Sequence, residues 1–322
     1  MEFVQINQLA KKIKQNVNNV IVGKDEVIEQ LLIAMIVSGH VLLEDVPGTG
    51  KTLLAKSMAK SLNCNFKRIQ FTPDLLPSDL TGIHYFNQKA GEFQFRPGPI
   101  FTNILLADEI NRATPRTQSS LLECMEERQV TIDGKTFKLE KPFMVIATQN
   151  PVETQGTFPL PEAQLDRFLM KVNMGYPSKK EGIQILKRFK ADMPLANITA
   201  VAQSEEIINA QQAYASVYVH EDILAYIMDI VESTRKHIDV VLGISPRGSQ
   251  ALLKAVQVRA ILNERNYVLP DDVKAMLQPV CSHRVILKNV SCLKKGQAEK
   301  VLTQIINQVT VPTEEDMEKW VP

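Results

Sequence analysis

The segment from Val41 to Ala55 constrains the fold of this chain more than any other. It reads Val-Leu-Leu-Glu-Asp-Val-Pro-Gly-Thr-Gly-Lys-Thr-Leu-Leu-Ala, an apolar strand, a glycine-rich loop and the start of a helix. Glycines at positions 48 and 50 let backbone N–H groups close around an anion at the helix N-terminus. Lys51 is placed to reach the terminal phosphates, and the Thr52 hydroxyl to contact a phosphate-bound Mg²⁺. The segment therefore predicts a site for ATP or GTP.

One position departs from the strict phosphate-loop pattern. That pattern has glycine where this chain has Asp45, so Asp45, Val46 and Pro47 must form the beginning of the loop. The alternative is a glycine-rich turn that precedes a helix by chance. Two polar motifs further along the chain favour the nucleotide site.

Composition sets broad limits. The chain has 322 residues, of which 44% are hydrophobic and 23% charged, enough for a substantial core and for two domains. Lys plus Arg number 37 and Asp plus Glu 36, so the overall charge predicts neither a strong nucleic-acid footprint nor an anionic membrane surface. No apolar run approaches the roughly 18 residues of a membrane span, and the first residues do not resemble a signal peptide. We expect a soluble, cytoplasmic protein.

The cysteines and histidines predict no metal centre. The four cysteines include no C-x-x-C pair, which suits reduced thiols in a cytosolic compartment. The five histidines are scattered without the spacing of zinc ligands. We therefore expect neither a structural zinc nor a cysteine or serine nucleophile.

Hydrophobic periodicity divides the chain into an α/β part and a helical part. Two helical patterns fill residues 7–40, with a break at residues 20–24. Short apolar runs then alternate with helical patterns, as in a parallel sheet covered on both faces; they occupy residues 41–44, 66–71, 103–107, 143–147 and 168–172. Amphipathic helices dominate after residue 177, at about 179–190, 204–216, 220–237, 246–264, 270–279 and 296–308. We place the domain boundary between residues 176 and 177, giving domains 1–176 and 177–322.

Two inserts interrupt the α/β pattern, and one residue pair predicts a helix start. A hairpin at about 83–95 lies within the insert at 73–99, and a second spans 129–139 around an Asp-Gly turn. Ser245 and Pro246 suit the cap and first turn of the helix at 246–264. Arg247 then lies at the N-terminal end of that helix.

Two further strands end in polar residues. The run at 103–107 is followed by Asp108, suited to hold Mg²⁺ through water, and by Glu109, suited to polarise a water for attack on the γ-phosphate. In isolation, such a pair is more often the end of a strand or a helix cap. The run at 143–147 leads to Asn150, placed to hydrogen-bond the γ-phosphate and the attacking water, although Asn before Pro is ordinarily a turn residue.

The order of these motifs resembles the AAA+ ATPases, and within them the MoxR family. The resemblance covers most of residues 20–260 and is carried by Val22-Gly-Lys24, Leu43-Glu-Asp-Val-Pro-Gly-Thr-Gly-Lys-Thr52, Arg96-Pro-Gly-Pro-Ile-Phe101, Ala107-Asp-Glu-Ile-Asn-Arg-Ala113, Ala147-Thr-Gln-Asn-Pro151 and Leu160-Pro-Glu-Ala-Gln-Leu-Asp-Arg-Phe168. It implies a parallel five-stranded sheet between helices, followed by an α-helical lid domain. The two hairpins resemble the helix-2 insert and pre-sensor-1 hairpin of this branch. In this family, the departure from the strict phosphate-loop pattern at Asp45 is itself usual.

The resemblance implies roles for particular residues. Lys51 and Thr52 would belong to Walker A, Asp108 and Glu109 to Walker B, and Asn150 to sensor 1. The residues expected to contact the nucleotide or its Mg²⁺ are Val22, Gly23, Pro47, Gly48, Thr49, Gly50, Lys51, Thr52, Leu53 and Asp108, with Thr52 and Asp108 at the metal.

Four arginines are candidates to act between subunits or from the lid. Arg167 resembles the arginine finger that enters a neighbour's site, and Arg247 resembles sensor 2 of the lid; the catalytic set is thus Glu109, Asn150, Arg167 and Arg247. For Arg167 the alternative is a salt bridge to Glu162 or Asp166, and for Arg247 a solvent-exposed helix end. Arg112 and Arg116 are further candidates to face a neighbouring subunit.

The resemblance implies an ATPase that forms a ring, a hexamer, and couples hydrolysis to the remodelling or maturation of a client protein. Partners with a von Willebrand factor A domain are associated with the family. Three alternatives stay open: an ATP-gated scaffold with little turnover, a DNA-directed AAA+ motor and a metabolite kinase. The balanced charge disfavours the DNA motor. A kinase is disfavoured because the sequence has no evident segment for binding a phosphate acceptor.

Overall fold

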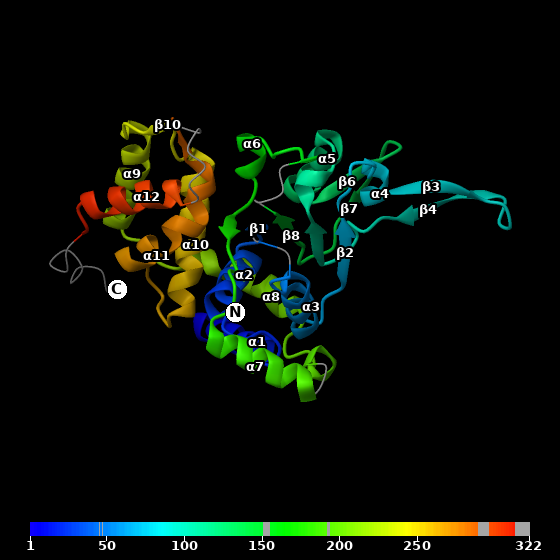
Figure 1. Ribbon diagram of the computed structural model, residues 1–322, viewed down its shortest axis with the longest axis horizontal. Helices are drawn as coiled ribbons and strands as arrows, with labels where there is room; N and C mark the ends of the chain where they lie inside the picture. Colours follow the sequence, from blue (N-terminus) through cyan, green and yellow to red (C-terminus); the bar gives the residue numbers. More distant parts are fainter. Residues whose placement is uncertain (45, 47, 151–154, 192–193, 289–295, 313–322) are drawn as a thin grey trace.

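A computed structural model of the chain describes residues 1–44, 46, 48–150, 155–191, 194–288 and 296–312 (Figure 1). Asp45, Pro47 and Pro151 lie outside the described residues. A central sheet carries helices on both faces. A group of helices lies beside one end of the sheet, and a hairpin extends from the other (Figure 1).

The central sheet has five parallel strands, as the hydrophobic pattern predicts. Their spatial order is β2, β5, β8, β1, β9, and their bounds are Val41–Glu44 (β1), Phe66–Gln70 (β2), Ile104–Asp108 (β5), Met144–Gln149 (β8) and Met170–Val172 (β9). The three inner strands are almost wholly buried, which explains their continuous apolar runs. The fold class is therefore confirmed.

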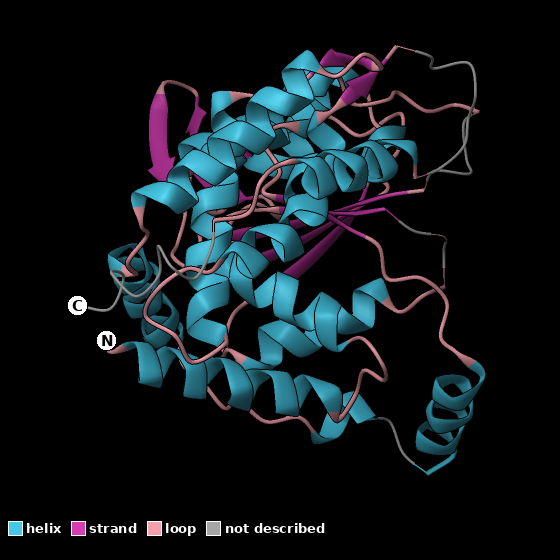
Figure 2. Cartoon of the chain, turned by 90° about the vertical axis from the view of Figure 1, so that its left-hand side faces the viewer, coloured by secondary structure: helices cyan, strands magenta, loops and turns pink. Residues whose placement is uncertain are grey.

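Alternate strand residues face two separate layers of core. Leu43 and Ile146 join a cluster with the helices α1 (Phe3–Asn18), α2 (Asp25–Ile36) and α3 (Lys51–Ser61). Leu42 and Val145 join a second cluster with α5 (Pro115–Glu127). This alternation is the strand period of two, and it places the sheet between two helical layers (Figure 2).

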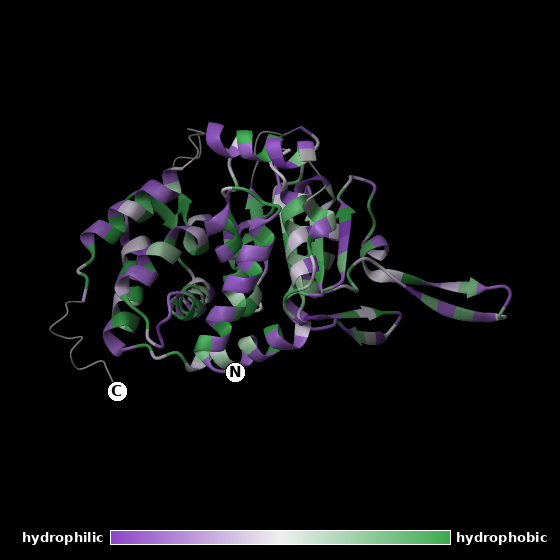
Figure 3. Cartoon of the chain, turned by 90° about the horizontal axis from the view of Figure 1, so that it is seen from below, coloured by the Kyte–Doolittle hydropathy of each residue, from purple (hydrophilic) through white to green (hydrophobic). Residues whose placement is uncertain are grey.

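Two antiparallel hairpins project from the α/β layers, at the places that the turn signals predict. The first pairs β3 (Gly82–Asn87) with β4 (Glu92–Pro97) and follows α4 (Pro77–Thr81). The second pairs β6 (Gln129–Ile132) with β7 (Lys135–Lys138). Its Asp-Gly turn has φ of 49° and 78°, the left-handed conformations of a tight two-residue hairpin. The β3–β4 hairpin reaches well beyond the body (Figures 1 and 3).

The second half is mainly helical. The remaining elements are η1 (Ile110–Arg112), α6 (Glu162–Leu165), α7 (Lys179–Ala191), η2 (Pro194–Asn197), α8 (Ser204–Ala213), η3 (Tyr214–Ser216), α9 (Glu221–Lys236), β10 (Val240–Leu242), α10 (Pro246–Leu262), α11 (Pro270–Cys281), η4 (Ser282–Arg284), β11 (Ile286–Leu287) and α12 (Gln297–Gln308). Helices α9 to α12 form the group beside the sheet (Figure 1). Helix α8 packs on α2 instead. The boundary between residues 176 and 177 stays a prediction.

The start of α10 has the predicted cap. The Ser245 hydroxyl accepts a hydrogen bond from the Gly248 N–H at 3.0 Å, and Pro246 occupies the first turn. This cap fixes the first residue of the helix and therefore the position of Arg247 in its first turn. Among the described helices, none is both long and apolar enough to cross a membrane.

A buried histidine, His40, connects the sheet to α5. Its Nδ1 accepts a hydrogen bond from the Val145 N–H at 2.9 Å, so its Nε2 carries the proton and donates to the Met125 carbonyl at 3.0 Å. Burial, followed by the charge of Arg128, lowers the pKa of His40 to about 3. The ring is therefore neutral in the folded chain at neutral pH.

This pKa predicts a loss of stability in mild acid. In the unfolded chain His40 titrates near its ordinary pKa of about 6.5, so between pH 6.5 and 3 the unfolded state binds more protons. The free energy of unfolding should fall as the pH drops through that window, by at most about 1.4 kcal/mol per pH unit for this histidine. Urea unfolding at pH 7 and pH 5 should show a smaller pH effect in His40→Gln than in the wild type. His237→Gln is the matched control; an equal pH effect in all three proteins would contradict the account.

Candidate functional site

The glycine-rich loop lies between the carboxyl end of β1 and the N-terminus of α3. Gly48 and Gly50 have φ of 84° and 93°, in the left-handed region that glycine adopts without strain. A Cβ added at either would meet no atom of the described residues within 4 Å, so the described part of the loop is open on that side. The Thr49 hydroxyl and the Lys51 ammonium each donate to the Val46 carbonyl at 3.3 Å. The loop thus has the backbone geometry of an anion cradle.

The two acidic residues lie at the end of β5. They are therefore at the same side of the sheet as the glycine-rich loop, where the parallel strands end, which we call the carboxyl edge. Thr148, on β8, connects them: its hydroxyl donates to Asp108 Oδ1 at 2.6 Å and accepts from the Glu109 N–H at 2.8 Å. Glu109 has a φ of 57°, a left-handed conformation that costs energy in a residue other than glycine. The Thr148 hydrogen bond holds Glu109 in that conformation.

The side chain of Glu109 is held through one of its oxygens. Its Oε2 accepts from Gln70 Nε2 at 2.6 Å and pairs with Arg112 Nε at 3.0 Å. From the sequence, Arg112 is a candidate to contact a neighbouring subunit. In the structure it pairs with Glu109 of its own chain. Arg116 is exposed on the first turn of α5.

A basic residue that sequence reasoning missed pairs with Asp108. Arg68, on the neighbouring edge strand β2, donates from Nε at 3.0 Å and from Nη2 at 2.6 Å to Asp108 Oδ2. The strand register aligns Gln70 with Asp108, two residues after Arg68. The available signal was an arginine on the predicted strand 66–71, but its pairing depended on strand order, which the sequence does not contain.

The strand order brings three predicted elements of the site together. Strand β8 lies between β5 and β1, so Asn150, directly after β8, is placed between Asp108 and the glycine-rich loop. Thr52 follows Lys51 in the first turn of α3, and the side chain of Leu53 packs against the core.

Val22 and Gly23 occupy the connection between α1 and α2. Val22 is buried, and Gly23 has a φ of 69°. The Glu181 side chain of α7 lies so close that a Cβ on Gly23 would overlap it. Lys24 donates to the Met174 carbonyl at 2.6 Å, which ties this connection to the chain that leaves β9.

The oxygen donors fit Mg²⁺ bound mainly through phosphate and water. Mg²⁺ usually takes one or two protein oxygens and keeps several waters. The Thr52 hydroxyl and the Asp108 carboxylate provide such oxygens at one edge of the sheet. Across the part of the chain that the structure describes, no group of three or more His, Cys, Asp or Glu residues is arranged to hold a metal.

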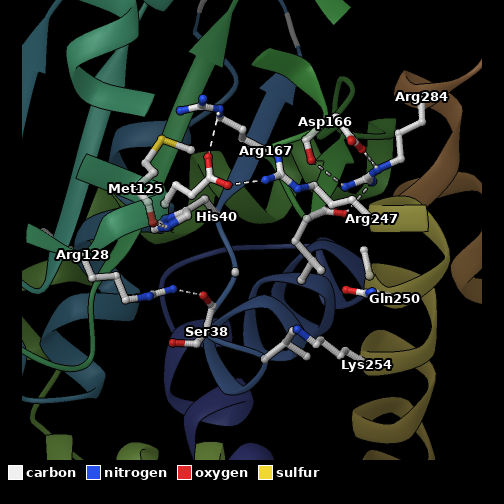
Figure 4. A pocket seen from close by; sticks show the side chains of 15 residues that line it. Ser38, His40, Met125, Arg128, Asp166, Arg167, Arg247, Gln250, Lys254 and Arg284 are labelled. Atoms are coloured by element: carbon white, nitrogen blue, oxygen red, sulfur yellow. Dashed lines mark hydrogen bonds and ion pairs between the residues drawn. The ribbon is translucent and has the colours of Figure 1, made fainter. Parts of the chain in front are cut away.

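Arg167 and Arg247 meet at a second location, on one carboxylate. Arg167 Nε lies 3.3 Å from Glu126 Oε2, and Arg247 Nη2 pairs with Glu126 Oε1. The partner of Arg167 is thus Glu126, which sequence reasoning missed, and not Glu162 or Asp166. A cavity of about 260 Å³ lies beside the three residues and is also lined by Lys254 and Arg284 (Figure 4).

The two arginines lie at the side of the sheet where the parallel strands begin, which we call the amino edge. The glycine-rich loop lies at the opposite, carboxyl edge. Arg167 lies three residues before β9, whose first residue aligns with Val41 at the start of β1, and the Leu169 N–H donates to the His40 carbonyl there. The loop follows the other end of β1. At about 3.3 Å per residue, the six residues of β8 separate the two edges by roughly 20 Å, too far for an arginine side chain to span.

A buried arginine fastens the lid to this amino edge. Arg284, with a side chain 3% exposed, donates from Nε to Asp166 Oδ1 at 2.6 Å and from Nη2 to the Phe168 carbonyl at 2.7 Å. The Ser245 hydroxyl donates to Asp166 Oδ2 at 3.0 Å. Asp166 therefore links the backbone beside Arg167 to the cap of the helix that carries Arg247.

The sheet, the phosphate loop, the acidic pair and the helical lid together define the AAA+ class of ATPases. Residues 40–170 match the family described as "ATPase family associated with various cellular activities", and residues 232–305 match the AAA lid domain. The chain is 49% identical to YeaC of Bacillus subtilis over 96% of this chain and 97% of that protein, and 40% identical to Chaperone MoxR1 of Mycobacterium tuberculosis over 92% and 80%. The crystal structure of a proposed ATPase from Cytophaga hutchinsonii superposes with a TM-score of 0.88 at 37% identity, covering 97% of each chain. The chain belongs to the MoxR family of AAA+ ATPases.

The Thr148 bridge generates a prediction. Thr148→Val keeps the shape but removes both hydrogen bonds, so Asp108 and Glu109 lose their common support in a site 1% exposed. Calorimetric titration should show Mg·ATP affinity reduced about tenfold, the equivalent of one buried hydrogen bond. Thr148→Ser keeps the hydroxyl and should bind within about threefold of the wild type, given the small cost of one lost methyl group. Equal affinities in the Val and Ser variants would contradict the bridging role.

Proposed function

We propose that this chain hydrolyses ATP at a site completed by a neighbouring copy of itself. The observation that carries the proposal is the placement of the site residues at two edges of the sheet. The phosphate loop, Asp108, Glu109 and Asn150 lie at the carboxyl edge, whereas Arg167 and Arg247 lie at the amino edge. One chain cannot bring the two groups together, but a second copy in head-to-tail contact can.

Residues of the carboxyl edge would bind and orient the substrate. The loop N–H groups and Lys51 hold the phosphates, and Thr52 and Asp108 hold Mg²⁺ through the nucleotide and water. When bound, Mg²⁺ would neutralise charge on the phosphate oxygens. Lys51 leaves its present contact with the Val46 carbonyl to reach them.

Glu109 and Asn150 would act on water. Gln70 and Arg112 contact Glu109 at Oε2, so we assign to Oε1 the acceptance of a proton from the attacking water. Asn150 orients that water against the γ-phosphate. As the new P–O bond forms, the bond to the β-phosphate oxygen breaks, giving ADP and inorganic phosphate.

Arginines from the neighbour would offset the charge of the transition state. A planar guanidinium supplied in trans is worth 10³ to 10⁵ in rate in GTPases. Arg167 and Arg247 are close enough to serve one phosphate group, because they already share one carboxylate. Repetition of this head-to-tail contact closes a ring, and we propose a hexamer in the cytoplasm.

The process that ATP hydrolysis would drive is proposed from the name of a related protein. One relative bears the name Chaperone MoxR1, which supports chaperone-like remodelling or maturation of a client protein. A partner with a von Willebrand factor A domain is a candidate on the family resemblance alone. The β3–β4 hairpin presents exposed aromatic side chains far from the nucleotide edge, including Phe86 and Phe93, 52% and 73% exposed. An ATP-gated scaffold is the second candidate, because Gln70 and Arg112 already engage the carboxylate of Glu109 that turnover needs.

Single variants separate these functions. Glu109→Gln removes the proton acceptor, so it should bind ATP but lose turnover; Arg167→Ala removes the trans cation and should do the same, with turnover reduced about 10³-fold or more. ATP binding and phosphate release measure the two steps. Lys236→Ala, which removes a cation 77% exposed in the last turn of α9, is the control and should stay within about twofold, the usual effect of a surface change. Full turnover in either site variant would refute the role assigned to it, and a wild type without turnover would favour the scaffold.

A further inference from the structure

Glu126 is an acidic residue in an unexpected place, between two cations that the proposed reaction needs. It lies in the last turn of α5, at the amino edge of the sheet, while α5 begins near the acidic pair at the other edge. We propose that Glu126 is a positioning residue: it holds Arg167 and Arg247 side by side so that both enter one phosphate site of the neighbouring subunit. This inference rests on the proposed function.

The pairing geometry leaves donors for a phosphate. Each oxygen of Glu126 serves one arginine: Oε2 takes Nε of Arg167 at 3.3 Å, and Oε1 takes Nη2 of Arg247. A guanidinium has five N–H donors in a planar fork. The nearest contact of Arg167 with Glu126 is through Nε, which leaves the two Nη groups, the fork that binds phosphate oxygens, directed away from that contact.

The support under Glu126 is rigid. The preceding residue, Met125, accepts a hydrogen bond from buried His40 through its carbonyl. Two residues later, Arg128 ends the helix with a φ of 52°, and its guanidinium donates to the Phe143 carbonyl at 3.1 Å and to the Ser38 carbonyl. The backbone on both sides of Glu126 is therefore fixed to the sheet, as positioning requires.

The arginines are fixed to each other by a second connection. Asp166 accepts hydrogen bonds from Ser245 and from buried Arg284, so the backbone of Arg167 and the first turn of α10 form one unit. Two guanidinium groups that converge in this way repel each other. The Glu126 carboxylate pairs with both groups, which offsets that repulsion and sets their spacing.

The ion pairs contribute little to the stability of the fold. Glu126, Arg167 and Arg247 have side chains 36%, 32% and 46% exposed, and exposed pairs are worth about 0–1 kcal/mol. A functional role explains the arrangement better than a structural one. The contrary role, a latch that withholds the arginines from the phosphate, makes the opposite prediction for turnover.

Three variants test the proposal. Glu126→Gln keeps the shape without the charge and should reduce kcat roughly 10-fold to 100-fold, because the reacting groups lose their alignment. The KM for ATP and the binding of ATP in the same chain should stay within about twofold, since the defect lies outside that chain's own site. Glu126→Asp keeps the charge and should recover part of the loss. Glu127→Gln removes the adjacent exposed charge and should match the wild type, with thermal unfolding confirming that all three fold.

Mixed assemblies identify the site at which Glu126 acts. Glu126→Gln mixed with Glu109→Gln should regain turnover, because some interfaces then combine an intact acidic edge with an intact arginine edge. Glu126→Gln mixed with Arg167→Ala should not, since both lie on the arginine edge. Unchanged or faster turnover in Glu126→Gln, or recovery in its mixture with Arg167→Ala, would overturn the positioning role. Full turnover in Arg167→Ala alone would overturn the proposed function instead.

Discussion

The strands of the central sheet all run in the same direction, so its two edges receive different parts of the chain. Each carboxyl end leads into a loop that precedes a helix, and those loops carry the glycines, Asp108, Glu109 and Asn150. The amino ends of β1, β2 and β9 receive chain that returns from a helix, and those of β5 and β8 receive chain that returns from the two hairpins; Arg167 lies three residues before β9. The proposed site depends on this polarity, because it places the phosphate loop and the acidic pair at one edge and Arg167 and Arg247 at the other.

Charged contacts hold both edges, and those of the amino edge join the lid to the sheet. At the carboxyl edge, the Thr148 hydroxyl bridges the two acids, and each acid also pairs with an arginine, Asp108 with Arg68 and Glu109 with Arg112. At the amino edge, ionic contacts dominate: Glu126 receives two arginines, and Asp166 receives Arg284 and Ser245. The second arrangement joins three separate segments, α5, the chain before β9 and the lid.

Much of this fold follows from local pattern. The apolar runs of β1, β5 and β8, the Asp-Gly hairpin and the Ser245 cap are decided by neighbouring residues, so the sequence predicts them to within a few positions. Several helix ends differ slightly, because a last turn becomes a 3₁₀ turn, as after α8.

The interactions that the sequence does not predict are long-range. Glu126 and Arg247 are 121 residues apart, and Arg68 and Asp108 are 40 apart; each pair depends on which strands are neighbours and where the lid docks. Glu126 reads as an ordinary charged residue near a helix end, like Glu127 beside it. The tertiary contacts with Arg167 and Arg247 distinguish the two.

The central claim is that one chain supplies the acidic edge of a site and its neighbour supplies the arginine edge. The most direct measurement is an electron cryo-microscopy structure of the Glu109→Gln protein with bound Mg·ATP. The account predicts an assembly in which the nucleotide contacts Lys51 of one subunit, while Arg167 and Arg247 of the next subunit lie within hydrogen-bonding distance of its terminal phosphates. A nucleotide contacted by the arginines of its own chain, or by no arginine from an adjacent subunit, would contradict it.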